Sequence, residues 1–228
     1  MEDLDLRILH HIGRYTITLR RVLQQELFDG GSPQGALDRL DRLGYIQRVE
    51  RQLPGNFSYY QLKKRGAAVI NISPNRAKPK EAKGLAQDLG ALWFSCMEDP
   101  RRKRLVDAEL KSLFGAHKGG NVIHVAQTGE ETTVFRLFIP EADTNLERYT
   151  TTLKRAAHQA CADEKLIRWI ERGTYQFAVL LTNKTRIEKL AELIRAEEFP
   201  DLRIQLAEAP SPRDLPQFIS PDKDGAES

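Results

Sequence analysis

The chain has 228 residues, of which 40% are hydrophobic and 29% charged, a balance typical of a globular protein rather than a disordered or membrane-embedded one. It contains no apolar run of about 18 residues, so no membrane span is expected. Its acidic start lacks the basic-then-apolar order of a signal peptide. Cys96 and Cys161 have neither metal-ligand spacing nor a disulfide framework. These features predict a cytoplasmic protein with two free, buried thiols and no membrane partner.

The net charge of +3 is small, but it is unevenly distributed along the chain. Residues 1–83 carry 15 Lys and Arg against 9 Asp and Glu, whereas the remainder carries 20 against 23. A basic first third suits contacts with nucleic-acid phosphates. An ordinary basic protein surface is the alternative interpretation.

Apolar residues at helical spacing predict three helices near the start of the chain. We expect them at residues 3–14, at about 18–28 with Thr18 as the N-cap, and at 33–43. Residues 29–31, Asp-Gly-Gly, form a turn between the second and third helices. Ser32 is expected to cap the third helix, with Pro33 at its first position.

A strand, a turn and a second strand follow the third helix. Residues 45–49 alternate as a strand does, residues 53–56 contain Pro-Gly-Asn, and residues 57–62 form the returning strand. Tyr59 and Tyr60 point to opposite faces, so one is expected in the core and the other exposed. A short helix is predicted from the basic segment at Lys63 through Ile70.

The rest of the chain predicts a second domain at residues 84–208, joined to the first at 1–72 by a basic, proline-containing linker at 73–83. Its expected elements are helices at about 85–97, 105–114, 145–162 and 185–195, and strands at 122–125, 132–139, 177–181 and 202–206. The basic run at 101–104 is interpreted either as a phosphate contact or as the solvated start of a helix. Residues 209–228 are proline-rich and polar, which predicts a disordered tail.

The second and third helices with their short turn predict a helix-turn-helix, whose third helix would enter the major groove of DNA. Its exposed face carries Gln34, Gly35, Asp38, Arg39 and Arg42. Gly35 would let the backbone approach DNA closely. Arg39 and Arg42 are three residues apart, which places them on one face, and arginine binds guanine or phosphate. A small helical core with two solvated arginines is the alternative.

The strand-turn-strand unit favours DNA binding, because a basic hairpin after a reading helix suits a wing that contacts the backbone or the minor groove. The fold expected is α/β (α+β), with an N-terminal winged helix-turn-helix followed by a small α/β domain. The candidate partner is double-stranded DNA. The candidate contact residues are Ser32, Gln34, Gly35, Arg39, Arg42, Arg48, Arg51, Asn56, Lys63, Lys64 and Arg65.

Three segments of residues 4–70, "LRRVLQQELF", "ALDRLDRLGYIQRV" and "YYQLKKRGAAVI", resemble the winged-helix half of the replication-relaxation family of plasmid and mobile-element proteins. The stretches "TTVFRLFIPEADTNLERYTTTLKRA" and "YQFAVLLTNKTRIEKLAELI" resemble its C-terminal part, which is similar to a restriction-endonuclease-type α/β domain. The resemblance implies a regulator of transcription or of plasmid replication. Regulators of this kind that read palindromes are often two-fold dimers, so a homodimer is also expected.

The resemblance also implies a pattern of two acids and a lysine that holds Mg²⁺ in catalytic members, and this chain departs from it. The strand at 123–127 has no carboxylate, and no lysine follows the second motif at the usual spacing. We therefore expect a non-catalytic protein without cofactor or metal. The first alternative is a metal-dependent nuclease using Asp107, Glu109, Glu141 and Asp143. The second is an adaptor whose winged helix binds protein, for which the arginines of the third helix are dispensable.

Overall fold

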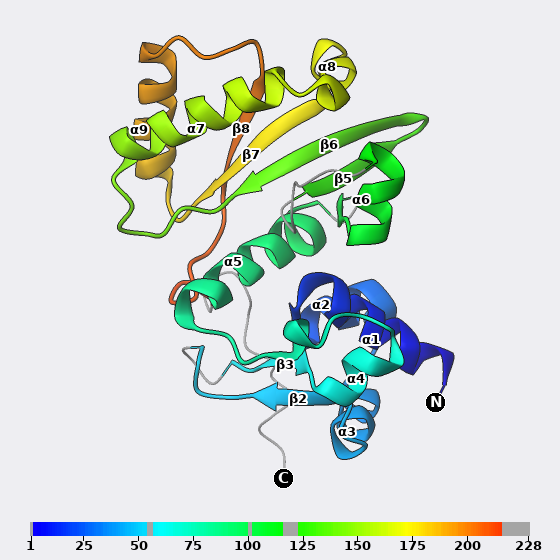
Figure 1. Cartoon of the computed structure of the whole chain (residues 1–228). Helices are drawn as coiled ribbons and strands as arrows, with labels where there is room; N and C mark the ends of the chain where they lie inside the picture. Colours follow the sequence, from blue (N-terminus) through cyan, green and yellow to red (C-terminus); the bar gives the residue numbers. More distant parts are fainter. Residues whose placement is uncertain (1, 54–56, 100–101, 116–122, 216–228) are drawn as a thin grey trace. The chain divides into compact units, whose positions relative to one another are not determined.

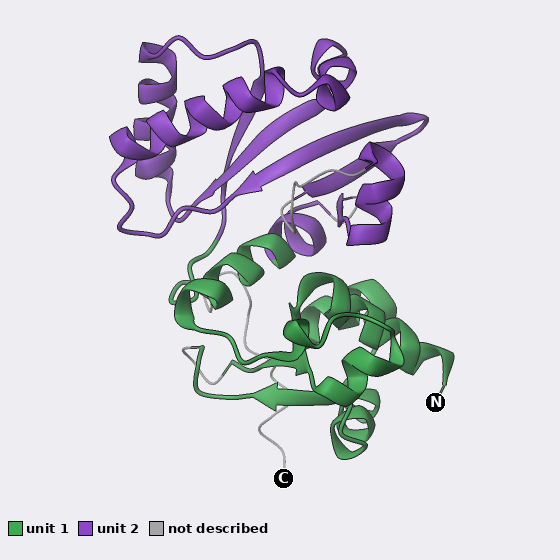
Figure 2. Ribbon diagram, viewed as in Figure 1, with its two compact units in different colours: residues 1–92, 210–228 green, residues 93–209 purple. Residues whose placement is uncertain are grey.

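A computed structural model of the chain describes residues 2–53, 57–99, 102–115 and 123–215. The chain divides into two compact units, which are coloured separately in Figure 2. The N-terminal unit comprises residues 1–92 and 210–228, and the C-terminal unit comprises residues 93–209. Each unit combines helices with one β-sheet, which confirms the predicted mixed α/β class (Figure 1). Across the described ranges, no helix combines the length and apolar character that a bilayer crossing requires.

The N-terminal unit is built around a three-stranded antiparallel sheet in the order β1-β3-β2. Helices α1, α2, α3 and α4 gather around this sheet (Figure 1). The elements in chain order are α1 (Asp3–Tyr15), β1 (Ile17–Thr18), α2 (Arg20–Leu27), α3 (Gln34–Arg42), β2 (Ile46–Val49), β3 (Tyr59–Leu62), α4 (Lys64–Val69), the 3₁₀ helix η1 (Pro74–Ala77) and α5 (Ala82–Leu92).

The core of this unit joins one face of the sheet to the apolar stripes of its helices. Ile8 on α1, Leu37 and Leu40 on α3, and Leu62 on β3 are all fully buried. These residues recur every three or four positions on the helices, which is the spacing that turns them to one side. The helical periodicity in the sequence therefore located the core correctly.

The second helix begins later than predicted. Thr18 is not its N-cap but lies in strand β1, opposite Tyr60 of β3. The Thr18 hydroxyl lies 3.0 Å from Nε2 of His11 instead of capping a helix. The backbone at Leu19 is extended and α2 starts at Arg20, because pairing with β3 keeps the preceding residues in a strand.

Tyr59 and Tyr60 are both buried, contrary to the prediction that one would be exposed. Tyr60 joins the core described above, and Tyr59 lies on the opposite face of β3. The Tyr59 hydroxyl donates a hydrogen bond of 2.7 Å to Oε1 of Gln52. Burial, and next the negative charge of Asp88 on α5, raise the pKa of Tyr59. The sheet therefore has a second covered face, to which α5 contributes.

The predicted linker at 73–83 and the beginning of the predicted second domain belong instead to the N-terminal unit. Arg76 of η1 donates hydrogen bonds to the carbonyl oxygens of Gly13 and Arg14, at 2.9 and 3.3 Å, which ties this segment to the end of α1. The predicted disordered tail also differs in part, because Ala209 and Leu215 are buried. Residues 216–228 of that tail lie outside the described residues.

The C-terminal unit holds a five-stranded mixed sheet in the order β4-β5-β6-β7-β8. The first three strands pair antiparallel, and β6, β7 and β8 run parallel. Helices α7, α8 and α9 lie together on one face (Figure 1). Its elements are the π-helix η2 (Trp93–Glu98), β4 (Arg102–Arg104), α6 (Asp107–Phe114), β5 (Ile123–Thr128), β6 (Glu131–Phe138), α7 (Leu146–Cys161), α8 (Glu164–Glu171), β7 (Tyr175–Leu181), α9 (Lys184–Ala196) and β8 (Arg203–Glu208).

Side-chain caps explain where the helices over this sheet begin. The side-chain oxygen of Asn145 accepts from the backbone N–H of Arg148 at 2.9 Å, and that of Asn183 accepts from Arg186 at 3.0 Å. Phe177, Val179 and Leu181 on β7 pack into the core beneath these helices. Of the two free cysteines, Cys96 is buried as expected, and Cys161 is only partly buried.

We predict that Gly66→Ala destabilises the protein. A methyl group on Gly66 would lie 2.1 Å from the carbonyl oxygen of Tyr45, a backbone atom that cannot move aside without shifting β2 or α4. Forcing an extra carbon into such a site costs about 1–3 kcal/mol, which urea unfolding would measure. Gly84→Ala is the matched control, because a methyl group there meets no atom within 4 Å. Equal stability of the two variants would contradict this packing.

We predict that His11 makes the protein sensitive to acid. Burial, and next the positive charge of Arg14, lower the pKa of His11 from 6.5 to about 4. Between pH 6.5 and pH 4, His11 therefore binds a proton in the unfolded chain but not in the folded chain. The free energy of unfolding is largest above pH 6.5 and decreases as the pH falls toward 4. The loss reaches at most about 3 kcal/mol. Urea unfolding of the wild type and of His11→Gln at about pH 7 and about pH 4.5 tests this. An identical pH dependence of both proteins would exclude His11 as the cause.

Candidate nucleic-acid interface

Helices α2 and α3 are joined by a tight turn that sets the start of α3. Gly30 has a φ of +88°, a left-handed conformation that glycine adopts without strain. The Gln24 side chain donates 2.7 Å to the carbonyl oxygen of Gly30, and the Gly30 N–H donates 2.9 Å to the carbonyl oxygen of Gln24. Ser32 Oγ then accepts from the backbone N–H of Gln34 at 3.4 Å. The prediction that Ser32 caps α3 with Pro33 at its first position is therefore wrong, because Pro33 is itself the N-cap and α3 begins at Gln34.

The outer face of α3 carries one polar stripe, because residues four apart lie above one another on a helix. Gln34 is partly exposed, while Asp38 and Arg42 are exposed. The amide nitrogen of Gln34 donates 2.6 Å to Oδ1 of Asp38. Gly35 lies beside Gln34, and a methyl group there would meet no atom within 4 Å. The stripe therefore offers an amide, an open backbone and an arginine, together with one carboxylate.

Arg39 does not share this outer face with Arg42, contrary to what their spacing predicts. Its guanidinium turns toward α1 and pairs with Oδ1 of Asp5 at 2.7 Å and with Oε2 of Glu2 at 2.8 Å. Asp5 is buried, so this pair ties α3 to the first turn of α1. The hydrogen bond that Arg39 donates to Asp5 is the main cause that raises the pKa of Arg39.

Two cationic side chains lie near the first turn of α3, and one of them, Arg20, was not predicted from the sequence. Arg20 opens α2, and its guanidinium donates 3.4 Å to Ser32 Oγ. Arg48 on β2 lies opposite Tyr60 of β3, and its Nε donates 3.0 Å to Ser58 Oγ. Burial raises the pKa of Tyr60, while Arg48 and Arg20 oppose that shift through their positive charges. The sequence signal that could have identified Arg20 is the turn after α2. This turn reverses the chain, so that Ser32 lies next to Arg20 at the start of α2.

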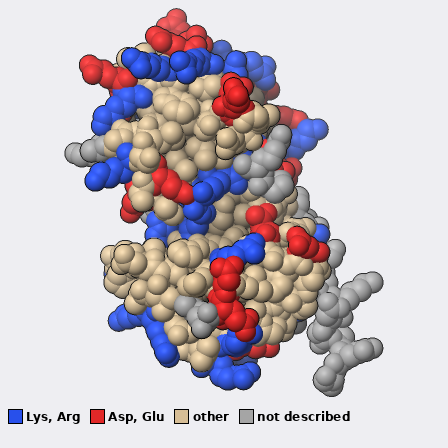
Figure 3. Space-filling model, turned by 90° about the vertical axis from the view of Figure 1, so that its right-hand side faces the viewer, with Lys and Arg blue, Asp and Glu red and all other residues tan. Residues whose placement is uncertain are grey.

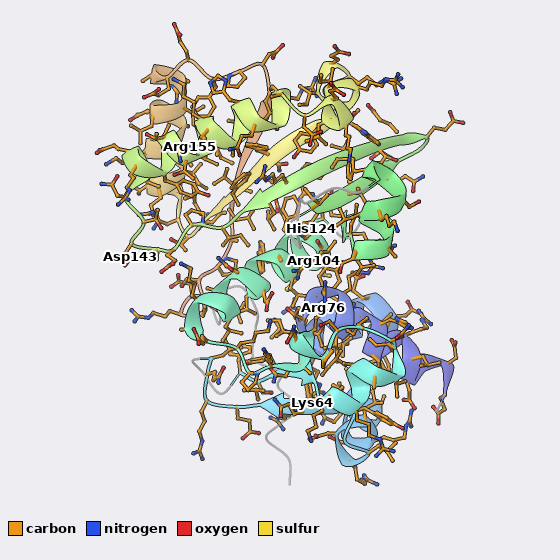
Figure 4. All side chains as sticks on the ribbon, in the orientation of Figure 1. Lys64, Arg76, Arg104, His124, Asp143 and Arg155 are labelled. Carbon is orange, nitrogen blue, oxygen red and sulfur yellow. The ribbon has the colours of Figure 1, made fainter. Side chains whose placement is uncertain are left out.

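The basic segment Lys63-Lys64-Arg65 lies at the C-terminal end of α3, where Arg42 is also located. Lys63 Nζ lies 3.2 Å from Oδ1 of Asp41. Arg65 donates 2.9 Å to the carbonyl oxygen of Leu43, and its guanidinium lies 4.8 Å from the ring centroid of Tyr45. Lys64, at the start of α4 (Figure 4), is exposed. Lys63 and Arg65 therefore hold α4 against α3, and Lys64 and Arg42 stay available.

The hairpin between β2 and β3 contributes Arg48 and Arg51. Arg48 is 46% exposed at its side chain and pairs with Glu50 at 3.3 Å. Arg51 is exposed, and its φ of +62° turns the chain into the hairpin. In the part of the chain that the structure describes, Arg42, Arg51 and Lys64 make no side-chain hydrogen bond or ion pair. Asn56, the remaining predicted contact, lies outside the described residues.

The basic run at residues 101–104 is not the start of a helix, one of its two predicted roles, and the described part of it is mostly engaged within the unit. Residues 102–104 form the edge strand β4 rather than a helix start. The Arg102 guanidinium lies 4.0 Å from the ring centroid of Phe94 and 2.9 Å from Glu98, and Arg104 is only 5% exposed. Lys103 pairs with Glu109 at 2.6 Å. These side chains hold η2 and α6 to the sheet, and Arg101 lies outside the described residues.

The four carboxylates of the nuclease hypothesis do not converge. Asp107 and Glu109 lie in the first turn of α6, where Glu109 also accepts 2.9 Å from the backbone N–H of Val106. Glu141 and Asp143 follow β6, at the opposite end of that strand from α6 (Figures 1 and 4). The described residues contain no group of three His, Cys, Asp or Glu side chains arranged to hold a metal ion.

Basic and acidic side chains alternate over the face of each unit that Figure 3 presents. On that face the basic residues form short groups rather than a continuous basic surface. Among the described residues of the N-terminal unit, Arg20 and Arg48 form one group near the first turn of α3, and Arg42 and Lys63 to Arg65 form another where α3 meets α4.

Comparisons with models of known protein families, with curated proteins and with solved structures found no match to this chain. The resemblance to the replication-relaxation family therefore stays a prediction from the sequence.

We predict different effects for Arg39→Ala and Arg42→Ala on stability. Arg39→Ala leaves the buried Asp5 carboxylate without its partner, which lowers the urea midpoint, because an unpaired buried charge is costly. Arg42→Ala removes an exposed side chain and changes the stability by less than about 0.5 kcal/mol. Equal midpoints for the two variants would show that the contact between α1 and α3 does not stabilise the unit.

Proposed function

We propose that the N-terminal unit is a winged helix-turn-helix that binds double-stranded DNA, and that the protein regulates transcription or the replication of a plasmid or mobile element without catalysis. The order α1-β1-α2-α3-β2-β3 supports this proposal, because it places a short hairpin directly after a candidate reading helix. The nuclease alternative lacks comparable support, since its carboxylates are spread over opposite ends of β6.

The observation that carries the proposal is the distribution of unpaired cations. Arg42, Lys64 and Arg51 are exposed and make no side-chain ion pair with other described residues, and they lie on α3, α4 and the hairpin. The reading helix α3 and the hairpin after it are the elements that we propose to meet the duplex, and Lys64 lies beside the end of α3. Arg39, Lys63 and Arg65 have structural partners instead, so we assign them to positioning the interface rather than to contacting DNA.

The polar residues at the start of α3 are the ones that we propose to recognise the base sequence of the DNA. An amide such as that of Gln34 can donate to and accept from the edge of adenine in the major groove. The space around the Cα atom of Gly35 is open, so the backbone at this position can approach the groove. Arg20 and Arg48 flank this region, and we assign to them a supporting contact with phosphates at its edges, made in place of the partners that they have in the free protein.

Replacement of Arg42 and Lys64 tests the proposal. Fluorescence anisotropy of the full chain on a random duplex across a salt series measures the affinity and its dependence on salt. Each lost phosphate contact lowers the slope of log affinity against log salt by about 0.9, so Arg42→Ala/Lys64→Ala lowers it by about 2.

Arg7→Ala/Lys78→Ala is the control, because it removes the same charge from exposed positions outside α3, α4 and the hairpin. If both double variants weaken DNA binding equally, the loss of affinity reflects the lower net charge of the chain and not the loss of specific contacts. Absence of binding by the wild type at low salt would overturn the proposal in favour of an adaptor whose helices bind protein.

A further inference from the structure

Helix α7 of the C-terminal unit has an inner face that fixes it rigidly to the sheet. Leu153 and Ala157 are fully buried there, and Leu146 and Ala160 are nearly so. Its 16 residues extend over about 24 Å at 1.5 Å per residue. A straight, well-anchored helix of this length presents its outer side chains in fixed relative positions.

The outer face of α7 is polar, and beyond Glu147 the charged residues on it are basic. The exposed residues follow one another at intervals of three and four, which places them in a single stripe. They are Glu147, Arg148, Thr151, Thr152, Arg155, His158 and Gln159. Figure 4 labels Arg155 on this helix.

From Arg148 to Gln159 the stripe contains no carboxylate that would neutralise its arginines. The acid of α7, Glu147 in the first turn, lies 3.5 Å from Lys189 of α9. The hydroxyl of Thr152 donates 3.3 Å to the carbonyl oxygen of Arg148 within the helix, so it does not engage an arginine side chain. Among the described residues, the guanidinium groups of Arg148 and Arg155 have neither an ion pair nor a side-chain hydrogen bond.

The neighbouring helix α9 differs from α7 in the charges of its outer face, which are those of an ordinary solvated helix. Its exposed residues mix both signs, and Lys184 lies 4.0 Å from Glu188 four residues later. Lys189 is likewise occupied by Glu147. The carboxylate-free stretch from Arg148 to Gln159 is therefore a property of α7 and not of the unit as a whole.

We propose that this face, Arg148 to Gln159 on α7, is a second contact for the phosphate backbone of nucleic acid, made by the C-terminal unit. The two arginines lie seven residues apart, about 10 Å along the helix axis, with hydroxyl, imidazole and amide groups along the same stripe. Arginine binds phosphate through its planar fork of donors, and neutral polar side chains add hydrogen bonds to the same backbone. The large apolar side chains that are exposed among the described residues lie on other elements, so the face lacks what insertion into a membrane needs.

This inference rests on the proposed function, because it assumes that the protein acts on nucleic acid. It extends that function by assigning the C-terminal unit sequence-independent affinity, while the N-terminal unit reads the sequence. Two such contacts on one chain raise the overall affinity without any new contact in either unit.

The test uses the full chain and a random DNA duplex long enough for both units to bind, with anisotropy measured across a salt series. Arg148→Ala/Arg155→Ala is expected to lower the salt slope by about 2 and to weaken binding. Lys184→Ala/Arg195→Ala on α9 removes the same charge from the same unit and is the matched control. All four side chains are exposed, and unfolding in urea verifies that each variant keeps its fold.

The outcomes separate this inference from the proposed function. If the α7 and α9 variants bind equally while Arg42→Ala/Lys64→Ala is impaired, the α7 contact is overturned and the proposed function stands. If the α7 variant alone is impaired, the α7 contact stands and the proposed interface on α3 falls. If the wild type does not bind the duplex at all, both are overturned.

Discussion

The carbonyl oxygen of Tyr45 is the point on which the proposed interface depends. It accepts a hydrogen bond of 2.9 Å from the backbone N–H of Lys63, and the Gly66 backbone packs so closely against it that no side chain fits between them. The N–H of Tyr45 meanwhile donates 3.0 Å to the carbonyl oxygen of Leu40 on α3. One residue thus joins α3, β2 and α4. These backbone contacts hold the basic segment at the start of α4 at the end of α3, together with the Lys63–Asp41 ion pair and the hydrogen bond from Arg65 to Leu43.

The sequence predicted the elements of the N-terminal unit well, because helical and strand periodicities are local. Leu37 and Leu40 repeat at helical spacing within α3, and the alternation of β2 is visible without knowledge of the rest of the chain. The orientation of Arg39 could not be predicted, since Asp5, its partner, lies 34 residues earlier. Burial of Tyr59 likewise depends in part on α5, a helix assigned to another domain from the sequence.

The same distinction between local and distant contacts explains which residues of the candidate site could be predicted from the sequence. The exposure of Gln34 and Arg42 follows from their positions on a helix with one apolar side, so sequence reasoning identified them. The structural roles of Lys63 and Arg65 depend on Asp41 and on the Leu43 carbonyl, which only the fold brings close. Charge and spacing alone therefore overestimated how many cations are free to bind a partner.

The C-terminal unit shows how far a charged motif can differ from its expected role. A run of four basic residues suggests a solvated surface, yet Arg102 stacks on Phe94 because strand pairing with β5 places it there. Guanidinium groups tolerate such burial better than ammonium groups, since they are planar, weakly hydrated and able to lie over aromatic rings. The ion pair with Glu98 then compensates the charge.

Strand β4 has a further consequence for how the protein behaves at high concentration. It is a three-residue strand at one margin of the five-stranded sheet, so on one side it pairs with no other strand among the described residues. Sheet margins of this kind can recruit strands from other molecules and start aggregation. The shortness of β4 and the charged Lys103 at its centre oppose such recruitment. The basic run that fastens β4 through Arg102 therefore also supplies, in Lys103, a charge that opposes the joining of separate copies of the chain sheet to sheet.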